Sequence, residues 1–169
     1  MANASQKSAV GVQILHRTGG MAIAQFGRLC VVVWRDAVTQ PTFDLQRAGL
    51  DQVVRNHPDG AGFLCVIEPS TRPPDDALRR ASAQMVMSHG DHLKCTGVVI
   101  EGEGFRAAIT RGVLSGMALL LSRKVQAMAF SDTFSALKWM RNYVPVGPIE
   151  RGTSFIEQVR KELDPLPER

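Results

Sequence analysis

The chain has 169 residues, of which 44% are hydrophobic and 21% charged, and its formal net charge is +4 at pH 7. This composition is typical of one globular domain and excludes a disordered chain. The longest apolar stretch, residues 112–121, is too short to cross a bilayer, so we expect no membrane span. The mild positive charge permits an anionic partner without requiring one.

The three cysteines, Cys30, Cys65 and Cys95, each lie inside or beside an apolar run. Buried thiols in a reducing compartment explain this pattern better than a disulfide framework. Residues 1–9 are small and polar and lack the apolar core of a signal peptide, so we expect a flexible tail there. The sequence therefore favours a cytoplasmic protein.

Hydrophobic periodicity predicts strands that alternate with helices after an initial hairpin. The predicted strands are, in chain order, residues 10–15, 21–26, 29–34, 62–67, 94–100 and 125–130. The predicted helices begin near residues 39–42, 73–76, 105, 131–132 and 154. Strand 29–34 is apolar on both faces, which places it near the centre of a sheet.

Several local signals fix the ends of these elements. The pair Gly27-Arg28 separates two strands by two residues, as in an antiparallel hairpin. Thr39 or Thr42 is the predicted cap of the first helix. Ser154 to Glu157 forms a capping box for a final helix that ends near Leu163, and in the helix before it Phe134, Leu137 and Met140 are predicted to point inward.

The predicted fold class is α/β, with a single mixed, mostly parallel sheet that begins with a β-hairpin and is flanked by helices. We divide the chain into a tail (1–9), an α/β domain (10–149), and a C-terminal helix and tail (150–169).

Three segments resemble a known family. Residues 29–36 form an apolar strand that ends in Trp34, and residues 63–68 form a strand followed by a helix that prolines open. Residues 127–140 combine a short strand, a Phe, an acidic residue and a helix containing Ala-Leu-x-Trp. Together they resemble the SpoIIAA-like, anti-sigma-factor-antagonist-like branch of STAS domains over about residues 20–143. The resemblance implies a small α/β domain without enzymatic activity that acts through protein partners.

In classical STAS domains a partner kinase phosphorylates a serine in an Asp-Ser-Ser-Gly-like turn after the third strand. The corresponding turn here, Glu68 to Pro73, lacks that motif but contains Ser70 and Thr71. A phosphate there would face unpaired helix amides and Arg72. Ser70 and Thr71 are therefore candidate phosphorylation sites, and helix capping by a hydroxyl is the alternative explanation.

Gly102 and Gly104 follow a predicted strand, and Arg106 comes just after them. Glycines let backbone amides approach an anion and an arginine can hold it, so these three residues form a candidate anion site. A tight turn between strand and helix explains the same residues.

His89, His92 and Cys95 are residue types that bind zinc, but they lack the paired spacing of a structural zinc site. The end of a helix, with His89 beside Gly90, accounts for the same pattern. We therefore predict no metal and no cofactor.

The sequence contains no nucleophile elbow, no metalloprotease motif and no dinucleotide fingerprint. Polar residues are expected to gather where the parallel strands end, an edge where open α/β sheets bind ligands. They are Arg35, Asp36, Glu68, Ser70, Glu101, Glu103, Ser131 and Asp132. Since they include no nucleophile–base pair, we interpret them mostly as caps and solvated charges and predict no enzymatic activity.

The predicted helix over residues 105–121 is apolar on nearly all sides, which indicates burial on more than one side. Its candidate interaction residues are Ile109, Val113, Leu114, Met117 and Leu121. The C-terminal helix, through Phe155, Ile156 and Val159, or a second subunit or partner could cover them. Both explanations stay open.

The leading hypothesis is a non-enzymatic, STAS-like regulatory module that docks to a partner protein, with homodimerisation as an option. The alternative is a module that binds a small apolar ligand or a lipid, suggested by an interior rich in methionine. The basic residues are dispersed and few aromatics lie between them, so we expect no nucleic-acid partner.

Overall fold

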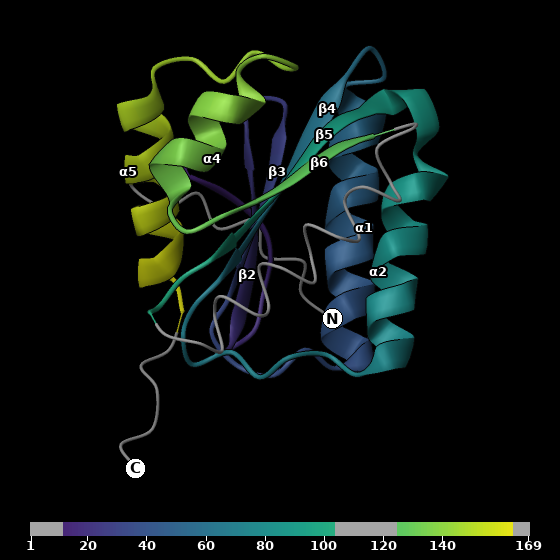
Figure 1. Cartoon of the computed structure of the whole chain (residues 1–169), viewed down its shortest axis with the longest axis vertical. Coiled ribbons are helices and arrows are strands. Elements are labelled where there is room, and N and C mark those ends of the chain that lie inside the picture. The colour runs from purple at the N-terminus through teal and green to yellow at the C-terminus, as the bar shows by residue number, and fades with distance from the viewer. Residues whose placement is uncertain (1–11, 104–124, 164–169) are drawn as a thin grey trace.

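The computed structural model describes residues 12–103 and 125–163 and shows one six-stranded mixed sheet between two layers of helices (Figure 1). The strands follow one another across the sheet in chain order. They are β1 (Gln13–Arg17), β2 (Met21–Phe26), β3 (Leu29–Trp34), β4 (Ala61–Ile67), β5 (Leu93–Ile100) and β6 (Gln126–Phe130). The predicted fold class is confirmed.

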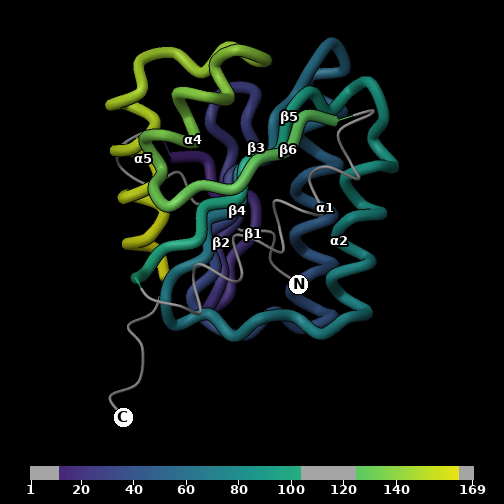
Figure 2. Tube along the Cα trace, in the orientation of Figure 1, coloured from purple at the N-terminus to yellow at the C-terminus, as the bar shows by residue number. Residues whose placement is uncertain are grey.

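The helices lie on both faces of the sheet. They are α1 (Gln40–Asn56), α2 (Asp76–Ser88), α4 (Thr133–Met140) and α5 (Ile149–Lys161), and the short 3-10 turn η1 (Gly90–His92) precedes β5. Helices α1 and α2 lie side by side on one face, and α4 and α5 lie side by side on the other (Figures 1 and 2). Within the described residues, none of the helices combines the length and apolar character needed to cross a bilayer.

Strands β1, β2 and β3 form an antiparallel meander. The predicted turn at residues 27–28 is confirmed, because Phe26 pairs with Leu29 and Gly27 has a φ of 56°, which glycine adopts without a Cβ clash. Strand β1 covers residues 13–17, whereas the predicted range was 10–15. Residues 10 and 11 of that range lie outside the described residues. Pairing with β2, which the local pattern does not indicate, decides where β1 begins and ends.

Strands β3 to β6 pair in parallel, and both faces of β3 are buried. Val31 and Val33 belong to the core beneath α4 and α5, whereas Val32 and Trp34 belong to the core beneath α1 and α2. This confirms that β3 is a central strand. Alternation of its side chains is what allows one sheet to support two separate cores.

Two predictions about the C-terminal third are wrong. Helix α5 begins at Ile149, so the predicted capping box at residues 154–157 lies inside it. Tertiary packing extends the helix toward its N-terminus, since Gly152 allows α5 to approach Leu137 of α4 closely. Phe134 is 48% exposed rather than inward, because Leu137 and Met140 define the buried side of α4 and leave its first turn at the surface.

Candidate functional site

Five strands, β1 and β3 to β6, end at the same edge of the sheet, and four of them end at or directly before a charged residue. Arg17 is the last residue of β1, and Arg35, Glu68 and Glu101 directly follow β3, β4 and β5. β1 runs parallel to β3 because both are antiparallel to β2. The predicted gathering at the carboxyl ends of the parallel strands is therefore confirmed for Arg35, Glu68 and Glu101. Their interpretation as caps and solvated charges is wrong for Arg35 and Glu68, because the two side chains are paired and largely buried.

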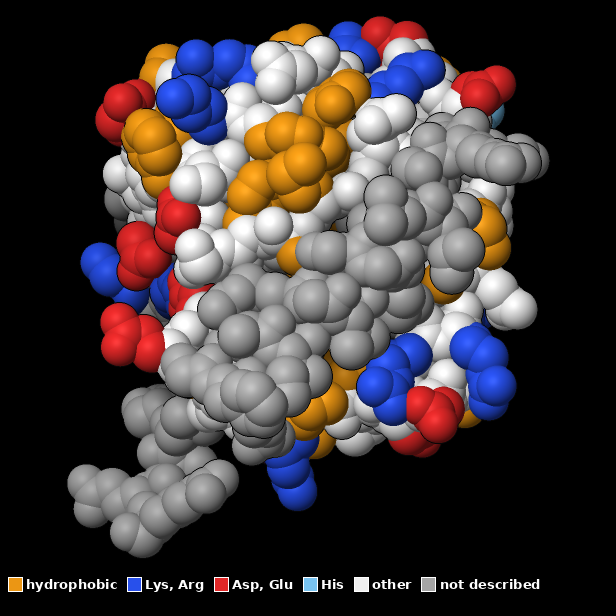
Figure 3. Space-filling model, in the orientation of Figure 1, with side chains coloured by type: hydrophobic (Ala, Val, Ile, Leu, Met, Phe, Trp, Pro, Cys, Tyr) orange, Lys and Arg blue, Asp and Glu red, His pale blue; other side chains and the backbone are white. Residues whose placement is uncertain are grey.

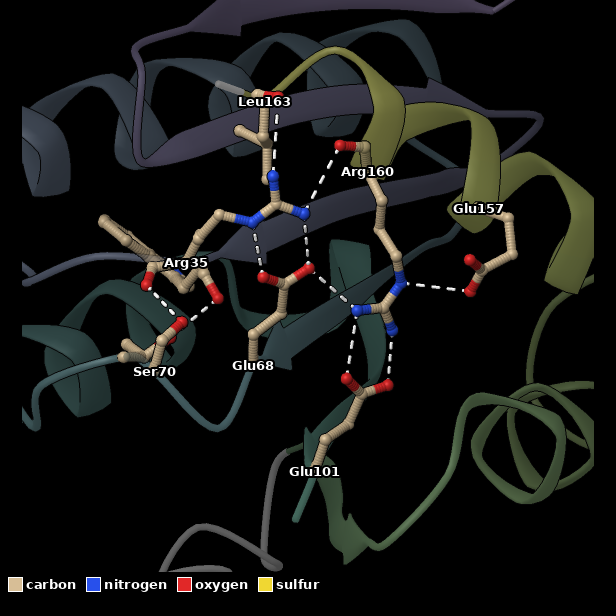
Figure 4. A network of polar contacts seen from close by, with 9 residues as sticks. Arg35, Glu68, Ser70, Glu101, Glu157, Arg160 and Leu163 are labelled. Atoms are coloured by element: carbon tan, nitrogen blue, oxygen red, sulfur yellow. Dashed lines mark hydrogen bonds and ion pairs between the residues drawn. The ribbon is translucent and has the colours of Figure 1, made fainter. Parts of the chain in front are cut away.

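Arg35 and Glu68 form the centre of this cluster. Arg35 Nε donates to Glu68 Oε2 at 2.6 Å, and Arg35 Nη2 donates to Glu68 Oε1 at 3.0 Å (Figure 4). A bidentate guanidinium–carboxylate pair is among the strongest polar contacts in proteins. It fixes the loop after β4 against the end of β3.

The third partner, Arg160, comes from the last turn of α5 and was not predicted. Its Nη1 donates to Glu68 Oε1 at 2.9 Å and to Glu101 Oε2 at 3.0 Å, and its Nη2 donates to Glu101 Oε1. Glu157, one turn earlier on α5, places Oε1 3.0 Å from Arg160 Nε. We call Arg35, Glu68, Glu101, Glu157 and Arg160 the strand-end network.

Further bonds tie the end of α5 to this edge. Arg35 also donates to the backbone carbonyls of Arg160 and Leu163, at 3.5 and 3.4 Å. Arg17 forms an ion pair with Glu162 at 3.1 Å. The last turn of α5 therefore spans the carboxyl ends of β1, β3, β4 and β5.

The charges of the network stabilise one another. Burial alone would raise the pKa of Glu68, but the hydrogen bonds and charges of Arg35 and Arg160 outweigh it and lower the pKa. The bond to Glu68 raises the pKa of Arg35. Burial would lower the pKa of Arg160, but Glu101, Glu157 and Glu68 raise it. Glu68 is thus held as a carboxylate between two permanent cations, an arrangement unsuited to proton transfer near neutral pH.

Displacing α5 to open this edge would be costly. The helix buries four large apolar side chains, which are Ile149, Phe155, Ile156 and Val159. Returning them to water costs about 6 to 12 kcal/mol, at 1.5 to 3 kcal/mol for each side chain. This is comparable with the whole stability of a domain, about 5 to 15 kcal/mol. Helix α5 is therefore part of the core and not a lid over a ligand site.

The candidate phosphorylation residues lie beside the network but do not cap α2. Ser70 Oγ donates to the carbonyl of Arg35 at 2.7 Å, and Thr71 Oγ1 donates to the carbonyl of Trp34 at 2.7 Å. The cap of α2 is Asp75, whose carboxylate accepts from the amide of Leu78 at 2.8 Å. The capping interpretation of Ser70 and Thr71 is wrong, because their hydroxyls donate to carbonyls at the end of β3 and Asp75 caps the helix. Phosphorylation stays a prediction.

The candidate anion site is described only in part, since Gly104 and Arg106 lie outside the described residues. Gly102 has a φ of 101°, a conformation that favours glycine, and a Cβ there would lie 3.4 Å from Pro69. The carboxylate of the preceding Glu101 is engaged by Arg160. These observations account for Gly102 as a turn residue.

His89, His92 and Cys95 lie in three different environments. His89 Nε2 lies 3.1 Å from Asp51 Oδ1, and His92 Nδ1 lies 2.6 Å from the carbonyl oxygen of Pro58. Cys95 is buried in the core on the opposite face of the sheet from α1 and α2. Among residues 12–103 and 125–163, no three His, Cys, Asp or Glu side chains gather as metal ligands would.

The five predicted interaction residues between Ile109 and Leu121 lie outside the described residues. Phe155, Ile156 and Val159, which were expected to cover them, are buried in the core beneath α4 and α5.

A second apolar surface, which the sequence pattern did not indicate, lies on β6 and α4. Met128 and Phe134 are 45% and 48% exposed, and Tyr143, which follows α4 in the chain, is 38% exposed. Trp139 stacks in tilted geometry on Phe130 at 5.6 Å and on Tyr143 at 4.9 Å. Figure 3 shows hydrophobic side chains gathered over this part of the molecule. We call these five residues the β6–α4 surface.

Comparisons of the chain with protein-family models, curated proteins and solved structures gave no significant match.

Proposed function

We propose that this chain is a non-enzymatic, STAS-like regulatory module that acts by docking to a partner protein through the β6–α4 surface. The observation that carries the proposal is a contrast between two parts of the molecule. The edge where open α/β sheets bind ligands is filled by the chain's own charged side chains, whereas large apolar side chains gather on β6 and α4.

The strand-end network supports a role without catalysis. Glu68 and Glu101 are both held by Arg160, and Glu68 is also held by Arg35. A general acid or base needs a pKa near the working pH. The network instead lowers the pKa of Glu68, which moves it further from neutral pH. The network instead links the ends of β3, β4 and β5 to the end of α5 and so forms a rigid support for the sheet.

The three cysteines support a cytoplasmic location. Each is unpaired, and Cys30 and Cys95 are buried. Cys30 and Cys95 lie in the cores on opposite faces of the sheet, so their side chains do not approach one another. Unpaired buried thiols are typical of proteins from reducing compartments.

The test compares two exposed methionines. Met128 and Met87 are both 45% exposed, but Met128 lies on the β6–α4 surface and Met87 on α2. The wild-type chain and the variants Met128→Asp and Met87→Asp are immobilised, and proteins retained from a lysate of the source cells are quantified. We expect a protein that the wild type and Met87→Asp retain and that Met128→Asp retains about tenfold less, because a buried charge opposes apolar contact. The captured protein is then purified and its binding to the three chains is measured.

Two controls make the result decisive. Both variants are unfolded in urea, and an exposed substitution is expected to change stability by no more than about 0.5 kcal/mol. If every retained protein binds the two variants equally, the β6–α4 surface is not a docking surface and the proposal is wrong. An adduct of a lipid or apolar molecule in the native mass spectrum of the purified chain would instead favour a ligand-binding module.

A further inference from the structure

The two outermost strands of the sheet, β1 and β6, differ in how they are protected against pairing with another strand. Strand β1 has a register shift between Ile14 and His16 and ends in Arg17. Strand β6 has the sequence Gln-Ala-Met-Ala-Phe, without a charged residue, a proline or a register shift. Charges, prolines and bulges are the usual means by which proteins block an edge strand. Among the described residues, these devices protect β1 but not β6.

The apolar side chains of the β6–α4 surface lie along this edge. Side chains alternate along a strand, so Met128 projects to the same face of the sheet as Phe130, which packs on the core beneath α4. Trp139 of α4 lies against Phe130 on that face. An extended segment added beside β6 would therefore place every second side chain against Met128 and its aromatic neighbours.

The charges around this surface identify the kind of partner that fits it. Lys138 of α4 and Arg141, which directly follows α4, are exposed, and neither forms an ion pair with a carboxylate of the described residues. The carboxylate of Asp132 caps α4 by accepting from the amide and hydroxyl of Ser135 at 2.8 and 2.9 Å. A second copy of the chain would bring like charge to this surface, whereas an acidic partner would complement it.

We propose that the edge of β6 accepts an extended segment of an acidic partner protein as an added strand. Its alternate apolar side chains contact Met128 and Trp139, and its acidic residues lie near Lys138 and Arg141. This inference rests on the proposed docking function, and it adds the mode of docking and the charge of the partner.

The experiment uses the full chain and a displayed library of random peptides about ten residues long, enough to span the strand. We expect the selected peptides to be net negative, with apolar residues at alternate positions. Binding of the tightest peptide should weaken about tenfold when alternate backbone nitrogens are methylated, since an added strand depends on main-chain hydrogen bonds. Hydrogen exchange of residues 126–130 should slow by about tenfold when that peptide binds.

A pair of lysine variants tests the charge. Lys138 and Lys161 are both exposed in the last turns of α4 and α5, but only Lys138 lies beside the β6–α4 surface. Lys138→Glu should weaken peptide binding about tenfold, and Lys161→Glu should leave it unchanged within about twofold.

Several results would overturn the inference. They are a failure to select any peptide, a selection of neutral or basic peptides, binding that tolerates backbone methylation, and equal effects of the two lysine variants. A dimer in sedimentation experiments that Met128→Asp dissociates would identify a second copy as the occupant. Capture of a partner that depends on Met128, together with a negative result here, would leave docking intact and refute strand addition alone. If partner capture does not depend on Met128 and the peptide experiment is also negative, both docking and strand addition are refuted.

Discussion

Replacing Arg160 with methionine tests whether the strand-end network holds the C-terminal helix to the sheet. The substitution keeps most of the side-chain volume but removes the guanidinium that contacts Glu68 and Glu101. The side chains of Arg160 and Glu68 are only 14% and 10% exposed, so the contacts are shielded from water. Removing one partner of a buried ion pair costs about 3 to 5 kcal/mol. Glu68 keeps Arg35, so we expect the lower end, about 3 kcal/mol.

The pH dependence of this loss follows from the pKa of Glu68, which lies below its ordinary value of 4.5 in the folded chain. A carboxyl group with a lowered folded pKa stabilises the fold above its unfolded pKa, and the contribution is lost as pH falls through the folded pKa. On acidification the variant loses less unfolding free energy than the wild type, because in the variant only Arg35 still lowers the pKa of Glu68. The difference in unfolding free energy between wild type and Arg160→Met should therefore be largest near pH 7 and shrink below about pH 4.5.

Urea denaturation at pH 7 and pH 4 measures both effects, with Arg17→Met as the matched control. Arg17 pairs with Glu162, the residue directly after α5, but the Arg17 side chain is 50% exposed. An exposed pair contributes about 0 to 1 kcal/mol. In thermal unfolding, a loss of 3 kcal/mol corresponds to about 6 to 12 °C in a chain of this length. Equal costs for the two variants at pH 7, or a difference that does not shrink in acid, would refute the reasoning.

Two further predictions concern the interior of the sheet. Gly62→Ala should destabilise the chain by about 1 to 3 kcal/mol in urea denaturation, because the added Cβ would lie 2.6 Å from Leu29 Cδ2; a change below about 0.5 kcal/mol would mean that Leu29 moves aside freely. Burial raises the pKa of Cys65 and Cys95 to about 12 and also raises that of Cys30. All three thiols should therefore resist iodoacetamide at pH 8 until the chain is unfolded, as followed by mass spectrometry, and labelling of the native chain at any of them would contradict this burial.

Local sequence patterns were sufficient for the kind and order of most elements. The two-residue turn at Gly27 and the apolar run of β3 depend on neighbouring residues alone, so periodicity and turn chemistry identify them. The same holds for Asp132, which caps α4 from the position just before it. The grouping of Arg35, Glu68 and Glu101 was also predictable, because parallel strands place their carboxyl ends along one edge.

Only the tertiary structure decided what these charged groups do. Arg160 meets Glu68 and Glu101 across 92 and 59 residues of sequence, and its i,i+3 pairing with Glu157 is the only part visible in the sequence. The start of α5 and the outward direction of Phe134 likewise depend on how α4 and α5 pack on the sheet. Short-range preferences determine which segments become strands and helices, whereas contacts between distant segments form only once the layers have packed and a long side chain can reach its partners.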